Sequence, residues 1–375
     1  MILMHKDIPV AKIEMRGTAI AEFVLLNKEH MPTGLSERLI RAQFPKWLAA
    51  RTIPQNRQGR EKIQRVIGDI GEAAVKSMVV SLTDCYWLKP DGSNLVWRDV
   101  NFHDNGFSDQ LSDVVTGDAS NITVSDFRLP DLTTDGVLEK TWMHSGNTPV
   151  LLKRGNLPGT TNNLLSANEV IASAIGERLG ISIVPYSTVY IREEALCGCP
   201  CFISDSNVEF VSAHYVCSEY RVYGPDLFTW FVQHGTEKEI KDLIFLDHLI
   251  HNTDRHEKNF GILRDPDSLQ ILGMAPIFDS GTSLDWNGMR NAYKHDAKPF
   301  FDNRYEQLAL LTSEDIRKRN NIDPAECAAI IESVYEKYRI SEGQKDLAVQ
   351  SVKTSCQELV DRTKLNAVPE KSTKQ

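Results

Sequence analysis

Residues 251–281 read HNTDRHEKNFGILRDPDSLQILGMAPIFDSG and hold the most informative pattern of this chain. Before them, residues 238–252 repeat apolar side chains at three- and four-residue steps, which predicts a helix with one buried face. The quoted stretch predicts a polar loop and then two short strands joined by a turn at RDPDS. An acidic residue follows the second strand. We therefore expect helix, loop, hairpin and acid, in that order.

Three side chains in this stretch suit phosphoryl transfer from ATP. Asp254 and Asn259 lie in the loop, and Asp279 ends the hairpin. The reaction needs a base near the acceptor hydroxyl and a magnesium ion on the departing phosphates. Asp254 is the candidate base, whereas Asn259 and Asp279 offer the hard oxygen ligands that Mg²⁺ prefers. The alternative is an ordinary polar helix exit, and the elements on both sides of the loop favour the phosphotransfer interpretation over it.

Two motifs carry a family resemblance. The loop HNTDRHEKNF, residues 251–260, resembles the catalytic loop of HipA-like serine/threonine kinases and is similar to that of phosphatidylinositol kinases. The segment IFDSG, residues 277–281, resembles the metal-binding turn of the same family. The fold class that this implies is α+β. It is a two-lobed protein-kinase-like fold with a mixed α/β N-terminal region and a mainly helical C-terminal lobe.

The resemblance also implies a role for each residue that matches these motifs. Asp254 would be the catalytic aspartate, and His256 would brace the loop. Asn259 and Asp279 would be the magnesium ligands.

A lysine upstream suits the nucleotide. The apolar run VLLK predicts a strand that presents Lys153. In kinases such a lysine contacts the ATP phosphates and is steadied by a glutamate on the following helix. Residues 166–180 predict that helix, with Ser166 as its N-cap and Gly180 at its end, and Glu169 is the candidate partner. The alternatives are a solvated lysine at a strand end and a surface charge on the helix.

The segment TTDGVLEK, residues 133–140, resembles the flexible phosphate loop of HipA-like kinases. In that family a hydroxyl residue is followed three positions later by Gly and then by Glu-Lys. The resemblance implies nucleotide contacts from Thr133, Thr134, Gly136 and Lys140. The family hydroxyl, usually a serine, can be autophosphorylated, and Thr133 stands in its place with Thr134 next to it. A turn with two capping hydroxyls is the alternative.

Strands are also predicted after the helix. Residues 181–185 and 187–191 have strand-like sequence, and residues 201–203 form another short apolar run. By its order in the chain, this last run would be the hinge between the lobes. Phe202 and Ile203 would then supply the apolar floor of an adenine pocket.

Length and composition agree with a globular two-domain protein. The chain has 375 residues, of which 41% are hydrophobic and 25% charged. No apolar run has the length of a membrane span, and the N-terminal residues carry charges where a secretory signal would be apolar. We expect a cytoplasmic protein. The expected division is an N-terminal accessory region, a nucleotide-binding lobe, a helical catalytic lobe and a frayed tail, at residues 1–125, 126–215, 216–365 and 366–375.

The formal net charge of −9 argues against general affinity for nucleic acid, but the charge is uneven. Basic residues dominate positions 35–65, within a predicted helical segment at about 34–83. This region could dock an acidic partner or nucleic acid, or it could be a solvated basic face. The basic residues are Arg38, Arg41, Lys46, Arg51, Arg57, Arg60, Lys62 and Arg65.

These patterns predict an ATP- and Mg²⁺-dependent serine/threonine protein kinase of the HipA-like type. Its substrate would be a protein hydroxyl, and a regulatory partner is compatible with the resemblance. A lipid or small-molecule kinase would use the same Asp254, Asn259 and Asp279. A non-catalytic nucleotide sensor or nucleic-acid-binding regulator is the third alternative.

Overall fold

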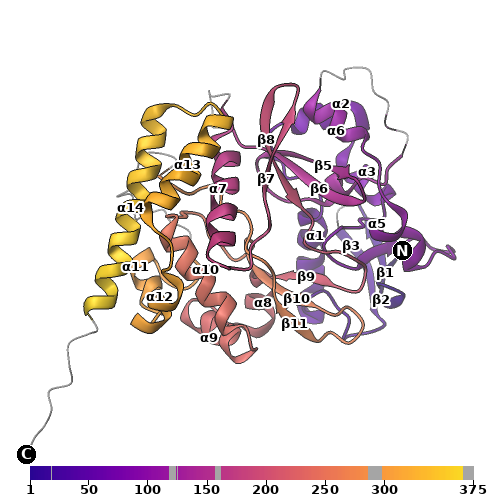
Figure 1. Cartoon of the computed structure of the whole chain (residues 1–375). Coiled ribbons are helices and arrows are strands. Elements are labelled where there is room, and N and C mark those ends of the chain that lie inside the picture. Colours follow the sequence, from indigo (N-terminus) through magenta and orange to yellow (C-terminus); the bar gives the residue numbers. More distant parts are fainter. Residues whose placement is uncertain (18, 118–123, 125, 157–161, 286–297, 366–375) are drawn as a thin grey trace, which may run out of the picture. The chain divides into compact units, whose positions relative to one another are not determined.

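The computed structural model describes residues 1–17, 19–117, 124, 126–156, 162–285 and 298–365. The chain forms two compact units whose segments alternate along the sequence (Figure 1). The first unit comprises Met1–Arg154, Gly198–Val222 and Gly261–Ala275, and the second comprises Gly155–Cys197, Tyr223–Phe260 and Pro276–Gln375. The division at residues 126, 216 and 366 stays a prediction, and the predicted frayed tail lies outside the described residues.

The first unit begins with an antiparallel sheet of order β3-β2-β1-β4, packed against short helices (Figure 1). Its core includes Phe44, Trp47, Ile63 and Leu111. The strands are β1 (Ile2–His5), β2 (Ile8–Arg16), β3 (Ala19–Leu25) and β4 (Tyr86–Lys89). The helices are α1 (Ile40–Ala50), α2 (Arg60–Ile67), α3 (Ile70–Lys76), α4 (Trp97–Val100), α5 (Phe102–Asn105) and α6 (Gln110–Thr116).

Two further β-structures complete this unit. The 3-10 helix η2 (Pro130–Thr133) leads into an antiparallel hairpin of β5 (Glu139–Ser145) and β6 (Thr148–Arg154). The other structure is a small sheet of β9 (Glu209–Ser212), β10 (Gly261–Arg264) and β11 (Ile271–Met274), with α8 (Ala213–Tyr220) following β9. The predicted strand at Lys153 and the predicted hairpin after Asn259 are confirmed.

The second unit is mainly helical. Strand β7 (Ser187–Ile191) lies beside the start of β8 (Glu194–Pro200), whose last residues, from Gly198, belong to the first unit. The helices are α7 (Leu164–Arg178), α9 (Pro225–Gln233), α10 (Glu237–Leu249), α11 (Arg304–Leu308), α12 (Ser313–Arg319), α13 (Pro324–Lys337) and α14 (Glu342–Leu365). Among the described residues, no helix combines the length and the hydrophobicity that crossing a membrane requires.

Helix α10 is confirmed, but its expected single buried face is wrong. Every residue from Asp242 to Leu249 is buried, so the last two turns of the helix are covered on all sides, whereas Glu237 and Lys238 in its first turn are exposed. Asp247 and His248 are buried together with the apolar residues, and such polar groups are tolerated only with partners. The three- and four-residue periodicity identified the helix, but it gave no measure of how much of the helix the fold encloses.

Two other local predictions also differ from the structure. Helix α7 begins at Leu164 and has Asn163, not Ser166, as its N-cap, because burying Leu164 and Leu165 extends the helix by almost one turn. Gly180, with φ +68°, does follow the helix end as expected. Residues 181–185 form no strand and make only a single parallel bridge, between Ile183 and Ile277. Pro185 limits further pairing because it has no N–H to donate.

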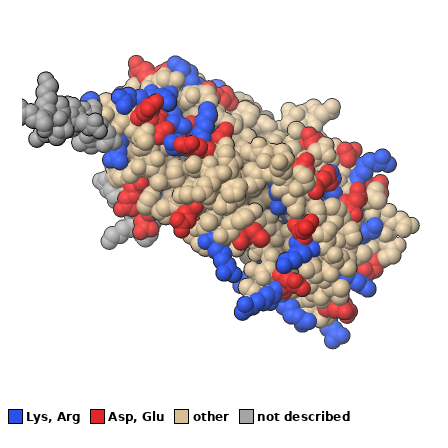
Figure 2. Space-filling view, turned by 90° about the horizontal axis from the view of Figure 1, so that it is seen from below, with Lys and Arg blue, Asp and Glu red and all other residues tan. Residues whose placement is uncertain are grey.

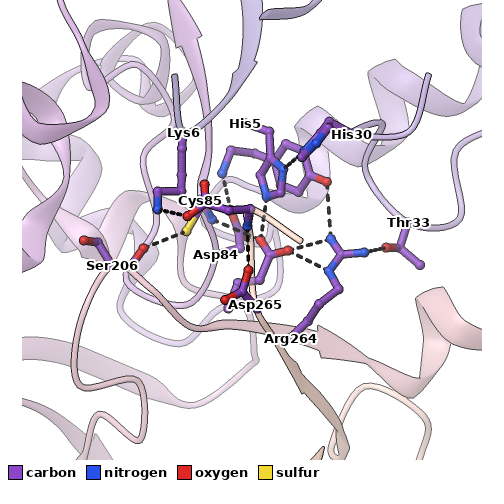
Figure 3. A network of polar contacts seen from close by, with 12 residues as sticks. His5, Lys6, His30, Thr33, Asp84, Cys85, Ser206, Arg264 and Asp265 are labelled. Carbon is purple, nitrogen blue, oxygen red and sulfur yellow. Dashed lines mark hydrogen bonds and ion pairs between the residues drawn. The ribbon is translucent and has the colours of Figure 1, made fainter. Parts of the chain in front are cut away.

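A buried polar network joins β1, β9 and β10 within the first unit (Figure 3). His5 Nε2 lies 3.0 Å from Glu209 Oε2, and Arg264 Nε donates to Glu209 Oε1 over 2.7 Å. The Nδ1 atoms of His5 and His30 are 2.8 Å apart, so they share one proton. The ring of His5 stacks on Tyr86. The network holds β10, the strand that follows the Asn259 loop in sequence, against the N-terminal sheet.

Acid is expected to destabilise the first unit through His30. Burial, and then the charges of His5 and Arg264, lower the pKa of His30 below its ordinary value of 6.5, against smaller opposing effects of Glu209 and Glu29. The unfolded chain therefore takes up this proton at a higher pH than the folded chain. The stabilisation is complete above about pH 6.5 and is lost as the pH falls through the lowered value.

This pH dependence can be measured as the urea midpoint of unfolding at about pH 7.5 and about pH 5.5. We expect the midpoint of the wild type to fall on acidification, and the fall to be smaller in His30→Gln. His214→Gln is the control, because His214 is exposed. An equal fall in all three proteins would contradict the assignment to His30.

Candidate active site

The predicted catalytic loop follows directly from α10. The helix ends at Leu249, and His251 then takes a positive φ of +51°, which turns the chain sharply. His251 Nδ1 lies 2.5 Å from Asp285 Oδ1, and both side chains are buried. Asn252 N donates to Asp247 O over 2.9 Å, and Asn252 Nδ2 donates to Asp247 Oδ1 over 2.9 Å. The loop is therefore anchored on the last turns of the helix.

A second set of hydrogen bonds joins this loop to the segment after the hairpin. Thr253 donates to Thr282 O twice, from its backbone N over 3.0 Å and from Oγ1 over 2.9 Å. Thr282 Oγ1 in turn lies 3.2 Å from Asn252 Oδ1. The hairpin β10–β11 lies between these two segments in the sequence but belongs to the first unit. The hydrogen bonds therefore connect two stretches of the second unit that are separated along the chain.

Arg255 is the centre of this assembly and is completely buried. Its guanidinium forms a double hydrogen bond with the Asp247 carboxylate, over 2.9 and 3.0 Å. It also donates to Asn259 O over 2.8 Å, to Phe278 O, and to Ser280 Oγ over 2.8 Å. One planar side chain thus holds the helix, the loop and the turn together.

The turn that carries Asp279 is held by α7 and by the segment after it. Ser280 N donates to Glu169 Oε2 over 2.8 Å, and Asp279 N donates to Tyr186 Oη over 3.2 Å. Asp279 has φ +58°, a conformation that side-chain-bearing residues adopt rarely and that is often found at functional sites. A Cβ on Gly281 would lie 2.8 Å from Leu165 O, so only glycine allows this close packing on α7.

The Asp254 carboxyl is partly buried and experiences the charge of Asp279. The pKa of Asp254 is raised above its ordinary value, first by burial and further by the negative charge of Asp279. His256, Arg255 and Lys298 act in the opposite direction. Lys298 Nζ donates to Asn252 O, which places this lysine beside the loop. A carboxyl whose pKa is shifted towards neutrality is suited to proton transfer.

The donor chemistry of Asn259 and Asp279 fits a magnesium ion. Asn259 Nδ2 donates to Asp254 O over 3.1 Å, which orients the carboxamide so that Oδ1 is the atom it can offer to a cation. Asp279 adds a carboxylate from the turn. Mg²⁺ in phosphotransfer sites is held by one or two such oxygen ligands together with water and substrate phosphates. His256 makes local contacts in the same loop, since its Nδ1 accepts from Lys258 N over 3.3 Å.

The remaining predicted residues, with the exception of Glu169, lie in the first unit. Lys153 is buried on β6 and pairs in register with Lys140 on β5. Lys140 Nζ donates to Asp135 O over 3.0 Å and lies against Gly136. Ile203 is buried, and Phe202 makes an edge-on contact with Phe210. Glu169 belongs to the second unit, so its pairing with Lys153 stays a prediction, as does the hinge role of residues 201–203.

Both threonines of the predicted phosphate loop use their hydroxyls in hydrogen bonds to residues outside the 133–140 segment. Thr133 Oγ1 donates to Val80 O over 2.9 Å, and Thr134 Oγ1 donates to Pro130 O over 2.7 Å. Trp142 Nε1 also donates to Thr134 Oγ1 over 2.8 Å. Each hydroxyl therefore has a backbone acceptor, and the nucleotide role of the two threonines stays a prediction. Phosphorylation at either position would have to break these hydrogen bonds first.

Two of the basic residues at positions 35–65 are buried rather than solvated. Arg51 pairs with Asp84 at 2.5 Å and lies over the ring of Trp47. Arg57 is 3% exposed and donates to the backbone of residues 134 and 136. Figure 2 shows Lys and Arg interspersed with Asp and Glu on the face it presents. Counting basic residues therefore overstates the cationic surface available to nucleic acid.

Sequence reasoning missed three residues that build the site: Asp247, Arg255 and Asn168. Asn168 is buried on α7, donates to Gly281 O and Ser283 O, and accepts from Tyr335 Oη over 2.7 Å. An aspartate among the apolar residues of α10 was the available signal, because a buried carboxylate requires a cationic partner nearby. Nothing in the sequence of α7 distinguished Asn168 from a surface amide.

No protein-family model matches the sequence, and no curated protein sequence matches it. Among solved structures, HipA of Shewanella oneidensis MR-1, determined with HipB and its operator DNA, is similar with a TM-score of 0.53 at 11% identity. That similarity covers 98% of this chain and 99% of the HipA chain. The Helicobacter pylori proinflammatory kinase CtkA gives a TM-score of 0.48 at 17% identity, over 61% of this chain and 94% of CtkA.

The likeness over nearly the whole chain defines a protein-kinase-like fold of the α+β class. In particular, it is the fold of the HipA-like kinases. The predicted fold class is therefore confirmed.

Proposed function

We propose that this chain is an ATP- and magnesium-dependent serine/threonine protein kinase of the HipA-like type. The observation that carries the proposal is the hydrogen-bonded assembly of the 251–260 loop with the 278–282 turn. In this assembly the Arg255 guanidinium donates to both Asn259 O and Phe278 O, so one side chain connects the two segments that carry Asp254, Asn259 and Asp279. The HipA-like fold supports the same conclusion.

In this proposal Asp254 accepts the proton of the acceptor hydroxyl, helped by its raised pKa. Asn259 and Asp279 hold magnesium, which when bound neutralises charge on the departing phosphates. His256 braces the loop. Arg255 fixes the positions of both ligand-bearing segments through its contacts with Asn259 O and Phe278 O.

The nucleotide contacts come from the first unit in this proposal. Lys153 binds the ATP phosphates, and Glu169 steadies it. Residues 133–140 cover the phosphates, and residues 202 and 203 line the adenine pocket. By analogy with the HipA structure, which was determined with HipB and DNA, a regulatory protein partner is part of the proposal.

The direct test is incubation of the purified chain with Mg²⁺ and radiolabelled ATP, together with protein, lipid and metabolite extracts. Label on proteins supports the proposal, and mass spectrometry of Thr133 and Thr134 then tests autophosphorylation. Label only on lipids or metabolites would move the function to the alternative kinase classes. No transfer to any acceptor under conditions of ATP binding would contradict a kinase.

Asp279→Asn is expected to weaken Mg²⁺-dependent ATP binding by at least about tenfold, because the ion loses a charged ligand. Binding measured in EDTA should change little. Calorimetric titration with and without Mg²⁺ measures both. Asp226→Asn is the matched control, since Asp226 is an exposed residue near the start of α9. Equal loss with and without Mg²⁺ would show that Asp279 supports the fold and not the metal.

A further inference from the structure

The entry to α2 contacts the predicted phosphate loop in the first unit. Arg57 Nε donates to Gly136 O over 3.0 Å, and Arg57 Nη2 donates to Thr134 O. The next residue, Gln58, donates its backbone N–H to Val137 O over 2.8 Å. Three backbone carbonyls of the loop, at residues 134, 136 and 137, are thus bound by two neighbouring residues of the N-terminal region.

A second contact holds the end of the loop, where β5 begins. Lys62 Nζ lies 2.6 Å from Glu139 Oε1, and Arg154 Nη1 lies 2.5 Å from Glu139 Oε2. Gly59, with φ +75°, allows this approach, since a Cβ there would lie 2.5 Å from Glu139 Oε1. The loop is therefore held at both ends of the stretch between Thr134 and Glu139.

The burial of Arg57 indicates that its side chain is committed to this contact. Burial lowers its pKa to about 10, against the opposing charges of Asp131 and Asp135, so it stays charged at neutral pH. Its Nη1 is buried and has no hydrogen-bond partner in the described part of the chain. Desolvating a guanidinium is costly. Two backbone carbonyls and the buried carboxyl of Asp131 offset that cost. A solvent-exposed Arg57 side chain would not have to meet it.

We infer that Arg57 is the positioning residue of the phosphate loop, through which the N-terminal region sets the affinity of the enzyme for ATP. This inference rests on the proposed function, because it assumes that residues 133–140 cover the nucleotide. If only a fraction of the molecules has the loop in its binding conformation, the apparent affinity for ATP falls by that fraction. Contacts that hold the loop in this conformation avoid the loss. Releasing the loop should therefore raise KM for ATP and leave the chemical step nearly unchanged.

The first measurement needs no catalysis. In Arg57→Met without nucleotide, we expect amide hydrogen exchange in peptides covering 133–140 to become roughly tenfold faster, while exchange in the second unit stays at the wild-type rate. Lys62→Met, which removes only a partly exposed ion pair, should give a smaller change in the same direction. Arg65→Met is the control, since Arg65 lies on α2, as Lys62 does, but is exposed.

The second measurement uses the active enzyme. KM for ATP should rise roughly tenfold in Arg57→Met with kcat within about twofold, and Arg57→Lys should restore part of the affinity because lysine keeps the charge but lacks the planar fork. Unchanged loop exchange in Arg57→Met would overturn the inference even in an active kinase. Faster exchange with an unchanged KM would also overturn it. A wild-type chain that binds ATP but never transfers phosphate would overturn the proposed function instead. The hydrogen-exchange measurement would then still test whether Arg57 holds the loop.

Discussion

Replacing Asp254 with asparagine is expected to lower the rate of phosphoryl transfer by about 10²–10⁴-fold. Asparagine has nearly the same shape but cannot accept the proton of the acceptor hydroxyl. The loop should keep its conformation, because the contacts that hold it are made by its neighbours Asn252, Thr253 and Arg255. ATP affinity should therefore stay within about twofold, as measured by calorimetry next to single-turnover transfer assays.

The pH dependence of transfer gives an independent check on Asp254. A base acts in its deprotonated form, and the pKa of Asp254 is raised above the ordinary 3.8 by burial and then by Asp279. Activity should therefore fall as the pH drops through that raised value, so the acid limb lies above the one expected of a solvated aspartate. Glu257→Gln, in the same loop, serves as the control and should keep the wild-type profile. Undiminished turnover in Asp254→Asn would remove this residue from the role of base.

Replacing Arg255 with methionine is expected to have the largest effect on stability. The change leaves the Asp247 carboxylate buried without its cation, which typically costs about 3–5 kcal/mol. It also removes the donors to Asn259 O, Phe278 O and Ser280 Oγ. Both ligand-bearing segments should lose their positions, so the variant should lose Mg²⁺-dependent nucleotide binding wherever it remains folded.

Chemical denaturation measures this loss of stability. Asp247→Asn combined with Arg255→Met should recover part of it, since a neutral amide is cheaper to bury than a lone carboxylate. Arg317→Met, at an exposed position of α12, should stay within about 0.5 kcal/mol of the wild type. If Arg255→Met unfolded at the same denaturant concentration as Arg317→Met, the proposed organising role of Arg255 would be wrong.

The order of elements around the site could be predicted because it depends on local patterns. Apolar periodicity located α10, and the turn-forming RDPDS separated β10 from β11. Patterns that depend on tertiary packing were less informative. The start of α7 is decided by the burial of Leu164 and Leu165, and no capping pattern encodes that. Residues 181–185 have strand-like composition, but in the described structure they form a β-bridge at one residue only, between Ile183 and Ile277.

The candidate site could be predicted as a set of residues but not as an assembly. Asp254, Asn259 and Asp279 stood out by residue type and order. Their supports did not, because Asp247 with Arg255, and Glu169 with Ser280, meet only after folding. Charge counting failed for a similar reason at Arg57. Composition cannot distinguish a solvated cation from one that is buried against backbone carbonyls.

The most direct test of the site is a crystal structure with Mn²⁺ and a non-hydrolysable ATP analogue, in which anomalous scattering locates the ion. We predict one Mn²⁺ bound at roughly 2 Å by Asn259 Oδ1 and by an Asp279 carboxylate oxygen, with the Asp254 carboxylate facing the γ-phosphate analogue. An ion and nucleotide bound elsewhere, with Asn259 and Asp279 both out of coordination distance, would contradict the assignment.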